Sequence, residues 1–363
     1  MTPRGITING RFLAQPMTGA QRFATETVLA IDRLLDTPDY QALRGRVELL
    51  TPRTVARSLL LNNIAIVRKG RLSGYAWEQL QLPLFTARRV LLGLAPLGPL
   101  LFNRQYVVVY DATFKAVPQG LSWKVRAVYD AIVPNLARRA SGVAAISDFT
   151  RREMRKWFGV DPARVALCYC GSDHVDRIQS DDAVLDRNDL RGRRYMLVVG
   201  LGGKNKNLDT LLAGFQAGAP EGLLLCIAGK RNPRIHGEVA ASAGPMVRFL
   251  GAVTDSELKA LYENATALIY PSTYEGFGLP PVEAMRCGCP VIASDQEAVV
   301  EVAAGAALHF PLAHPEQLSD LIRRVATDEA LRQELAAKGR VRAAQFTWER
   351  TARVLLDGCL AIP

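Results

Sequence analysis

Residues 270–283 read Tyr-Pro-Ser-Thr-Tyr-Glu-Gly-Phe-Gly-Leu-Pro-Pro-Val-Glu. The apolar run 267–270 at the start is typical of a buried strand, and residues 282–286 have a helical pattern. A strand, a glycine-bearing turn and a helix start bring free backbone N–H groups together at the positive end of the helix dipole, where an anion is stabilised. Two carboxylates, Glu275 and Glu283, flank this turn. They would repel a simple phosphate but accept hydrogen bonds from sugar hydroxyls, so the stretch indicates a nucleotide-sugar site.

Strand patterns and helix patterns alternate along both halves of the chain, whose 363 residues are enough for two domains. In the first half, strands are predicted at 6–9, 47–50, 64–67, 106–110, 142–146 and 165–169, and helices at 22–35, 77–85 (ending near Pro83), 123–140 and between 50 and 64. In the second half, elements are predicted at 196–200, 208–216, 223–228, 256–263, 267–270, 282–286, 291–293 and 315–326, before a last helix capped by Thr347. A polar stretch at 180–192 is the expected linker.

This order predicts an α/β fold with two doubly wound parallel sheets. Ligands of such sheets bind beyond the carboxyl ends of the strands. With two domains, we expect the ligand in the cleft between them.

Composition excludes several classes of protein. The chain is 49% hydrophobic and 22% charged, which is typical of a globular protein and not of a disordered one. The longest apolar run, 90–102, contains two prolines and two glycines and is too short to span a membrane. No apolar core of a signal peptide opens the chain. The six cysteines lack metal-site spacing, so we expect them to be reduced, in a cytoplasmic protein.

The net charge of +10 belongs to the first half: residues 1–180 carry +12 and residues 181–363 carry −2. A basic half indicates a polyanionic partner, either anionic lipid or nucleic acid, or else a solvated basic face without a partner. Nucleic acid is disfavoured because the basic residues come without an aromatic-interleaved motif. Arg88, Arg89, Arg138, Arg139, Arg151, Arg152, Arg155 and Lys156 are candidate lipid contacts, and the run 90–102 is a candidate for the membrane interface.

The spacing of Glu275 and Glu283 resembles the E-x7-E signature of the retaining glycosyltransferases of family 4, which have the GT-B fold. Three further stretches resemble that family in the same order: 198–208, 249–262 and 287–295. The resemblance covers essentially the whole chain and is strongest from Tyr195 to Phe310.

The resemblance implies two Rossmann-like domains: an acceptor-side domain at 1–180, a donor domain at 181–345, and a C-terminal helix at 346–363 that crosses back to the first. It implies a metal-independent hexosyltransferase that uses a nucleotide-sugar donor with retention of configuration. We expect GDP-mannose as donor, with UDP- and dTDP-sugars as alternatives. The expected acceptor is a lipid-linked glycan of a bacterial surface polysaccharide, met at the inner face of the plasma membrane.

The resemblance also assigns roles to residues. Lys206 matches the lysine that neutralises the leaving diphosphate, Glu283 the carboxylate that accepts the ribose hydroxyls, and Glu275 the one near the donor sugar. Leu201 stands where relatives usually have arginine or serine, so Lys204 or Lys230 is the candidate for a second cation. The remaining binding candidates are backbone groups at Gly19, Gly276, Phe277, Gly278 and Leu279, with Val253 and Thr254 near the base.

One departure concerns Tyr110-Asp111, because many relatives have His-Asp there. Tyrosine cannot act as a base near pH 7, but the departing phosphate oxygen can take the acceptor proton. Tyr110 is therefore compatible with activity, and Asp111 is expected to position the acceptor or Arg22. Two alternatives stay open: a GT-B epimerase or phosphorylase, and a non-catalytic nucleotide-sugar-binding partner of another transferase. The four histidines show no metal spacing and receive no role.

Overall fold

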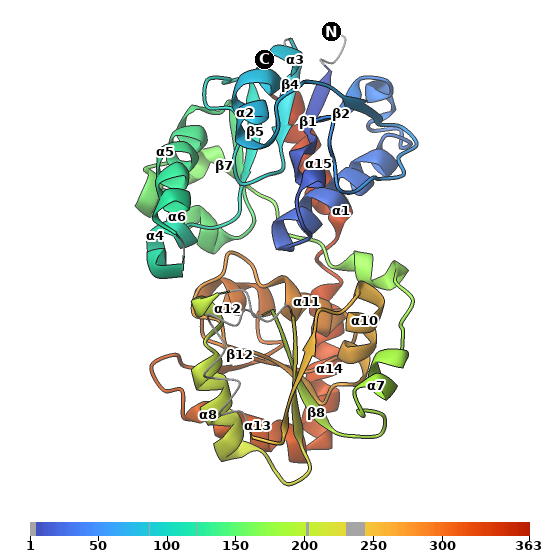
Figure 1. The fold of residues 1–363 in the computed structure, drawn as a ribbon, viewed down its shortest axis with the longest axis vertical. Helices are drawn as coiled ribbons and strands as arrows, with labels where there is room; N and C mark the ends of the chain where they lie inside the picture. Colours follow the sequence, from blue (N-terminus) through green and yellow to red (C-terminus); the bar gives the residue numbers. More distant parts are fainter. Residues whose placement is uncertain (1–4, 87, 121, 201–202, 230–243) are drawn as a thin grey trace. The chain divides into compact units, whose positions relative to one another are not determined.

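The computed structural model describes residues 5–86, 88–120, 122–200, 203–229 and 244–363. The chain divides into two compact units (Figure 1): unit 1 comprises Met1–Gly171 and Thr347–Pro363, and unit 2 comprises Ser172–Phe346. The sequence had placed the division at 180/181 and 345/346. Each unit is a parallel β-sheet flanked by helices, which confirms the predicted α/β class.

Unit 1 contains a seven-stranded parallel sheet in the order β3-β2-β1-β4-β5-β6-β7. Its strands are β1 Ile6–Asn9, β2 Val47–Thr51, β3 Ala65–Arg68, β4 Val90–Gly93, β5 Gln105–Val109, β6 Gly142–Ala145 and β7 Val165–Leu167. Its α-helices are α1 Gly19–Leu34, α2 Gly74–Ala76, α3 Leu82–Thr86, α4 Thr113–Ala116, α5 Trp123–Arg139, α6 Asp148–Phe158 and α15 Trp348–Leu360. Shorter 3-10 turns are η1 Gly10–Ala14, η2 Gln41–Leu43, η4 Pro118–Gly120 and η5 Pro162–Arg164.

The helix predicted between residues 50 and 64 is wrong. The described segment 52–63 has no helix. Instead, the buried Asp32 carboxylate accepts the backbone N–H groups of Asn62, Asn63 and Ile64 at 2.8–2.9 Å. A side chain 30 residues away satisfies these donors, so the segment leads into β3 without forming helical hydrogen bonds.

The helical piece near Pro83 also differs from its prediction, because helix continues to Thr86. A π-helical turn, Trp77–Gln81, comes first, and Pro83 then occupies the second position of α3. The helical run is continuous from Gly74 to Thr86, so Pro83 interrupts the regular hydrogen bonding directly after the π turn without ending the helix.

Most of the apolar run 90–102 is buried within unit 1 and is therefore not available to a membrane surface, contrary to our expectation. Its first four residues form β4, which is completely buried between β1 and β5. A central strand of a parallel sheet is covered on both faces and therefore reads as a continuous apolar run. None of the described helices is both long and apolar enough to cross a membrane.

Unit 2 contains a six-stranded parallel sheet in the order β10-β9-β8-β11-β12-β13. Its strands are β8 Tyr195–Val199, β9 Leu224–Ala228, β10 Val247–Gly251, β11 Ala267–Tyr270, β12 Val291–Ser294 and β13 Leu308–Phe310. Its helices are α7 Ala183–Arg187, α8 Leu208–Gly218, α10 Asp255–Asn264, α11 Leu279–Arg286, α12 Glu297–Ala303, α13 Gln317–Thr327 and α14 Glu329–Ala343, with 3-10 turns η6 Asp173–Arg177 and η7 Lys204–Lys206.

The segment 180–192, expected to be a linker, folds as part of unit 2. It contains α7, whose Val184 and Leu185 are buried. Its acidic composition hid these two apolar anchors, which explains why it looked like a boundary. All six cysteines have free thiols, as predicted: Cys168, Cys170, Cys226, Cys287, Cys289 and Cys359.

The last helix, α15, belongs to unit 1, where it packs beside α1 (Figure 1). Thr347 caps it as predicted, because its side chain accepts the N–H of Arg350 at 3.3 Å. Trp348, the first residue of the helix, is fully buried, and its ring meets Phe23 of α1 edge-on at 5.7 Å. The C-terminal segment thus completes the core of a domain whose other strands and helices come from residues 5–171.

Candidate functional site

The candidate site in unit 2 lies where the strand order of its sheet reverses. The chain proceeds outward from β8 to β9 and β10 on one side, and from β11 to β12 and β13 on the other. Loops that leave adjacent strands β8 and β11 therefore diverge above the carboxyl edge, where ligands of open α/β sheets bind. The β8 loop carries Lys206, and the β11 loop carries Glu275. The two predicted residues are thus 69 positions apart in the chain but meet at one edge.

An ion pair joins these two loops. Lys206 Nζ lies 2.6 Å from Glu275 Oε1, and the two side chains are 22% and 17% exposed. The same ammonium group lies 3.3 Å from the hydroxyl of Tyr270 and 5.1 Å from the centre of its ring. Tyr270 is the last residue of β11 and is buried. The site therefore presents a fixed cation with limited access to water.

Lys206 stays protonated at neutral pH. Burial opposes its charged form, but Glu275 and Tyr270 outweigh burial and raise the pKa of Lys206 above its ordinary value of 10.5. Because the folded-state pKa is raised, the stabilisation from this pair is fully present below about pH 10.5 and is lost only as pH rises through the higher folded-state value. Lys206 can therefore serve as a permanent cation.

The two oxygens of Glu275 differ in their surroundings. Oε1 accepts from Lys206 Nζ, from Ser272 Oγ at 2.6 Å and, more weakly, from Asn205 Nδ2 at 3.5 Å. Within the part of the chain that the structure describes, Oε2 accepts no hydrogen bond. One oxygen thus anchors the carboxylate, while the other has its full capacity to accept hydroxyl groups.

Hydrogen bonds also hold the two loops together through the backbone. Asn205 donates from Nδ2 to the carbonyl of Tyr274 at 3.1 Å, and its own carbonyl accepts the N–H of Thr273 at 2.8 Å. Gly200 and Asn207 have positive φ of 87° and 51° on the two sides of η7. These conformations turn the β8 loop sharply, so that Lys206 returns toward the β11 loop.

The start of α11 offers few backbone donors of its own. Gly278, with φ of 91°, caps the helix, and Leu279 is its first residue, as predicted. The next two residues are Pro280 and Pro281, which have no N–H. Gly278 and Leu279 are therefore the donors that remain at this positive helix end.

Two residues of the same loop are buried. Gly276 and Phe277 have little exposed surface, and the Phe277 ring packs edge-on against Phe346 at 5.5 Å. The Phe277 side chain therefore belongs to the core of unit 2, and only its backbone is left for a ligand.

Glu283 lies one helical turn after Leu279 and is 8% exposed. Its Oε1 lies 3.1 Å from Nε2 of His174, and its Oε2 accepts from the hydroxyl of Tyr262 at 3.2 Å. Both partners are buried and come from other elements, η6 and α10. The structure thus places Glu283 in a separate polar cluster and not in the Lys206–Glu275 pair.

The other predicted residues of unit 2 lie away from the Lys206–Glu275 pair or outside the described residues, or have side chains that the structure does not describe. Val253 is partly exposed beside the cap of α10, and Thr254 is that cap, in a capping box with Glu257. Lys204 opens η7, but its side chain lies outside the described part. Lys230 and Leu201 also lie outside the described residues.

Three predicted residues belong to unit 1. Gly19 is the first residue of α1, and a Cβ built on it meets nothing within 4 Å, so its backbone is open to a ligand. Tyr110 donates its hydroxyl to the carbonyl of Leu94 at 2.9 Å, its ring packs on Phe23, and burial raises its pKa well above 10.0. Asp111 accepts the N–H of Thr113 at 2.8 Å. Tyr110 thus has a structural role, which supports the prediction that it is no base.

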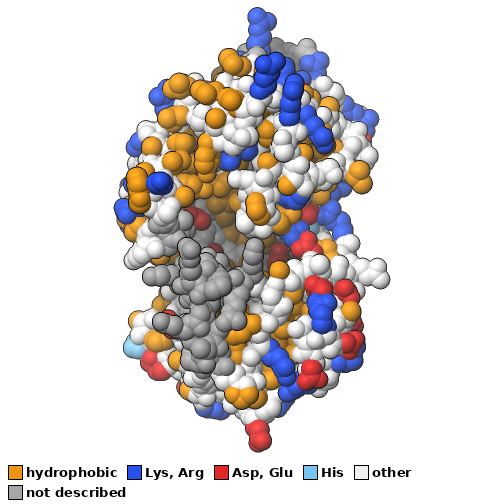
Figure 2. All heavy atoms as spheres, in the orientation of Figure 1, with side chains coloured by type: hydrophobic (Ala, Val, Ile, Leu, Met, Phe, Trp, Pro, Cys, Tyr) orange, Lys and Arg blue, Asp and Glu red, His pale blue; other side chains and the backbone are white. Residues whose placement is uncertain are grey.

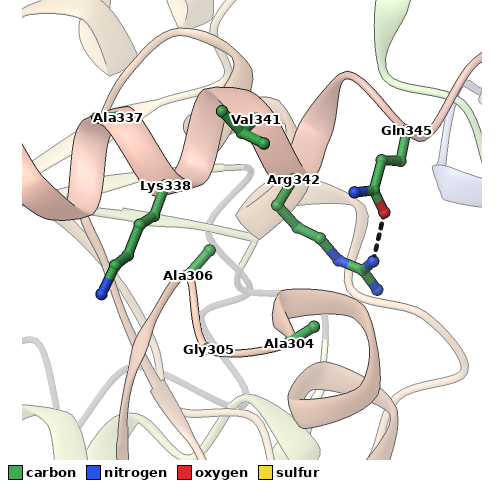
Figure 3. Close-up of a pocket in the computed structure, with 8 residues that line it drawn as sticks. All are labelled: Ala304, Gly305, Ala306, Ala337, Lys338, Val341, Arg342 and Gln345. Atoms are coloured by element: carbon green, nitrogen blue, oxygen red, sulfur yellow. Dashed lines mark hydrogen bonds between the residues drawn. The ribbon is translucent and has the colours of Figure 1, made fainter.

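A hollow elsewhere in unit 2 does not contribute to this site (Figure 3). It is lined by Ala304, Gly305, Ala306, Ala337, Lys338, Val341, Arg342 and Gln345. Arg342 is already engaged, with the carbonyls of Glu301 and Val302 and with Gln345. No carboxylate lines the hollow, and none of the predicted site residues belongs to it. Among the described residues, no three His, Cys, Asp or Glu side chains gather as a metal-binding group.

Sequence reasoning missed five side chains that shape the site. Tyr270, Ser272 and Asn205 stand inside the motifs quoted above, so their proximity to Glu275 and Lys206 was a usable signal. Tyr262 ends the stretch 249–262, but nothing local linked it to Glu283, which is 21 positions away. His174 stands outside the quoted stretches, 109 positions from Glu283.

Comparison with known proteins bears on this edge of the sheet. Residues 185–342 match the family model described as glycosyl transferases group 1. We refer to residues 185–342 as the group 1 domain because of this match. The matched segment includes Lys206, Glu275 and Glu283, whereas His174 lies before its first residue.

Two curated relatives of this chain are O-antigen mannosyltransferases by name. The chain is 31% identical over 217 residues to O-antigen chain mannosyltransferase B of Escherichia coli, covering 57% of each protein. It is 28% identical over 239 residues to O-antigen chain mannosyltransferase RfbU of Salmonella typhimurium, covering 62% of this chain and 64% of the relative. The matched parts thus span less than two thirds of these relatives.

Solved structures share the fold over nearly the whole chain. Sucrose-phosphate synthase of Thermosynechococcus elongatus aligns with a TM-score of 0.71 at 20% identity, covering 96% of both chains. WaaG, a glycosyltransferase involved in lipopolysaccharide biosynthesis, aligns with a TM-score of 0.70 at 18% identity, covering 97% of this chain and 100% of WaaG. The predicted GT-B architecture, with a group 1 domain as its second half, is confirmed at the level of the fold.

Proposed function

We propose that this protein is a retaining glycosyltransferase that moves a hexose, mannose in our proposal, from a nucleotide-diphosphate sugar to a glycan acceptor of a bacterial surface polysaccharide. The observation that carries the proposal is the Lys206–Glu275 pair at the carboxyl edge of the group 1 domain. A permanent cation suits the diphosphate, and the open Oε2 of Glu275 suits a sugar hydroxyl. The names of the two curated relatives support mannose.

The reaction needs stabilisation of the leaving group. The bond between the anomeric carbon and the diphosphate oxygen breaks, a bond from the acceptor oxygen to that carbon forms, and the acceptor proton passes to the departing diphosphate. Lys206 and the N–H groups of Gly278 and Leu279 would neutralise the developing negative charge. These groups make a metal ion unnecessary in the proposal. Tyr110 takes no proton, since its hydroxyl is engaged with Leu94.

The Tyr110 contact also keeps one alternative in view. A side chain that serves packing, where relatives carry histidine, is compatible with a nucleotide-sugar-binding partner that does no chemistry. Release of GDP from GDP-mannose by the purified protein, in the presence of a membrane extract that supplies acceptors, separates the two functions. Binding without release would favour the non-catalytic partner.

Thermal denaturation with nucleotides tests the donor. A nucleotide that binds the folded protein raises its melting temperature, since a ligand at 100 times its Kd adds about 2.7 kcal/mol of stability. We expect GDP to raise the melting temperature more than UDP or dTDP, because the proposed donor is GDP-mannose. A larger shift with UDP or dTDP would overturn GDP-mannose as the proposed donor. No shift with any of the three would overturn the function itself.

We further propose that the acceptor is lipid-linked and that unit 1 meets an anionic membrane surface from the cytoplasmic side. On the face drawn in Figure 2, Lys and Arg side chains are spread over unit 1, whereas acidic and basic side chains alternate over unit 2. Some earlier candidates are locally neutralised: Arg151 and Arg152 pair with Asp148, and Lys156 lies 3.5 Å from Glu153. Arg88, Arg139 and Arg155 are exposed and make no ion pair with any residue in the described ranges.

Binding to vesicles tests this surface. The protein should co-sediment with phosphatidylglycerol vesicles and not with neutral ones, and binding should fade between about 0.1 and 1 M salt, as the Debye length falls from roughly 10 to 3 Å. Reversing Arg88, Arg139 and Arg155 together should release the protein, since each charge near the surface contributes about 1 kcal/mol. Reversing Arg191, Arg324 and Lys338 of unit 2 is the matched control. Equal binding to neutral vesicles would refute the electrostatic account.

A further inference from the structure

Glu283 is held by two buried donors that the sequence analysis did not assign to the site. His174 is 3% exposed and Tyr262 is 2% exposed, and each reaches a different oxygen of the carboxylate. The three side chains come from η6, α10 and α11, so three separate elements converge on one carboxylate. Such a cluster is costly to bury, because every polar group leaves water.

The chemistry of the donors defines the direction of both hydrogen bonds. Burial, with the nearby Glu283 charge, raises the pKa of Tyr262 well above 10.0, so its hydroxyl keeps its proton. An ionised carboxylate can only accept, so the Nε2 of His174 that faces Oε1 must carry a hydrogen. Each oxygen of Glu283 thus receives one donor and retains a further lone pair.

The place of Glu283 on α11 relates the carboxylate to the anion site. Glu283 follows Leu279 by four residues, so the two share one face of the helix. Side chains of a helix lean toward its N-terminus, which brings the carboxylate toward the Gly278 and Leu279 N–H groups. In a nucleoside diphosphate the ribose directly adjoins the phosphates. A diphosphate at the start of α11 would therefore hold its ribose hydroxyls near Glu283.

We propose that His174 and Tyr262 are positioning residues that fix the Glu283 carboxylate for the ribose diol of the donor, and that His174 thereby sets a preference for ribonucleotides over 2′-deoxyribonucleotides. This inference rests on the proposed function. A carboxylate already held in one rotamer loses no further freedom on binding, so both of its remaining lone pairs are aimed before the ligand arrives. Only 10% of the Glu283 side chain is exposed, which leaves a narrow approach that suits two adjacent hydroxyls.

The test is calorimetry with GDP and 2′-deoxy-GDP on the full chain. Wild-type protein should bind GDP at least about tenfold more tightly than 2′-deoxy-GDP. This factor corresponds to the lower end of the range for one hydrogen bond to a charged group. His174→Ala should weaken GDP about tenfold and 2′-deoxy-GDP less than about twofold, so the discrimination disappears. His174→Gln keeps a side-chain N–H and should therefore recover part of the discrimination between GDP and 2′-deoxy-GDP. Tyr262→Phe removes only the hydroxyl and should act in the same direction.

His309→Gln is the matched control. His309 is another partly buried histidine of unit 2, whose Nδ1 lies 3.0 Å from the carbonyl of Ser294, and it does not contact Glu283. This variant should leave both Kd values unchanged. Circular dichroism melting of every variant identifies any that fail to fold. If His174→Ala does not fold, the two single variants His174→Gln and Tyr262→Phe are compared with the wild-type protein instead.

The outcomes separate this inference from the proposed function. A parallel rise of both Kd values in His174→Ala would show a purely structural role and overturn the inference. If Glu283→Ala weakens GDP while His174 and Tyr262 variants keep the discrimination, the inference alone fails. If Glu283→Ala leaves GDP binding unchanged, Glu283 does not hold the ribose and the inference fails, whereas the proposed function is overturned only if the wild-type protein binds no nucleotide. A wild-type preference for 2′-deoxy-GDP would also overturn the inference.

Discussion

Lys206→Ala should lower kcat by about 10²–10³-fold, the usual effect of removing one donor that stabilises developing negative charge. Lys206 is the one described side-chain cation at the carboxyl edge beside Glu275, and Glu275 holds it at 2.6 Å. Steady-state rates of nucleoside diphosphate release measure the effect. Added Mg²⁺ should not restore activity, because the proposed mechanism gives the charge of the leaving group to Lys206.

The control for Lys206 is Lys338→Ala, which removes the same charge from an exposed position of unit 2 paired with Glu334. It should retain wild-type kcat. Because the pKa of Lys206 lies above 10.5, activity between about pH 6 and pH 9 should show no loss from its deprotonation. Full activity of Lys206→Ala, or wild-type activity abolished by EDTA, would contradict the mechanism.

Trp348→Ala should destabilise unit 1 by about 3–5 kcal/mol, the range for deleting a large aromatic side chain from a core. Trp348 is fully buried against Phe23. A Cβ built on Gly171 would lie 2.3 Å from the Trp348 backbone nitrogen, so this residue is closely packed from a second direction. Urea unfolding followed by circular dichroism measures the loss, which should appear in the unit 1 transition alone.

Trp123→Ala provides the comparison, since it makes the same substitution at a ring that is 75% exposed. It should change stability by less than about 0.5 kcal/mol. Equal effects of the two substitutions would show that α15 does not complete the core of unit 1. Loss of stability in unit 2 instead would contradict the division of the chain at Thr347.

The difference between predicted and observed elements has a consistent cause. Ile6–Asn9 and Ala267–Tyr270 were predicted to the residue, since each is a short apolar run bounded by turn residues. The strand Val90–Gly93 was missed because it opens a longer apolar run, 90–102, in which no polar turn residue marks the end of the strand. The segment 52–63 was misread because the group that satisfies its backbone, Asp32, is remote in sequence. Such contacts leave no local pattern.

The amino-acid sequence was sufficient for the α/β class and the two parallel sheets, because periodicity and capping are local properties of the chain. The family resemblance named Lys206 and Glu275 as site residues, but only the structure showed that they form an ion pair. Folding was required to show that one oxygen of Glu275 is anchored while the other is open, and that His174 and Tyr262 hold Glu283. These relations depend on side chains brought together by sheet topology from up to 109 positions apart. A hydrogen bond depends on distance and angle in space, which spacing along the chain does not encode.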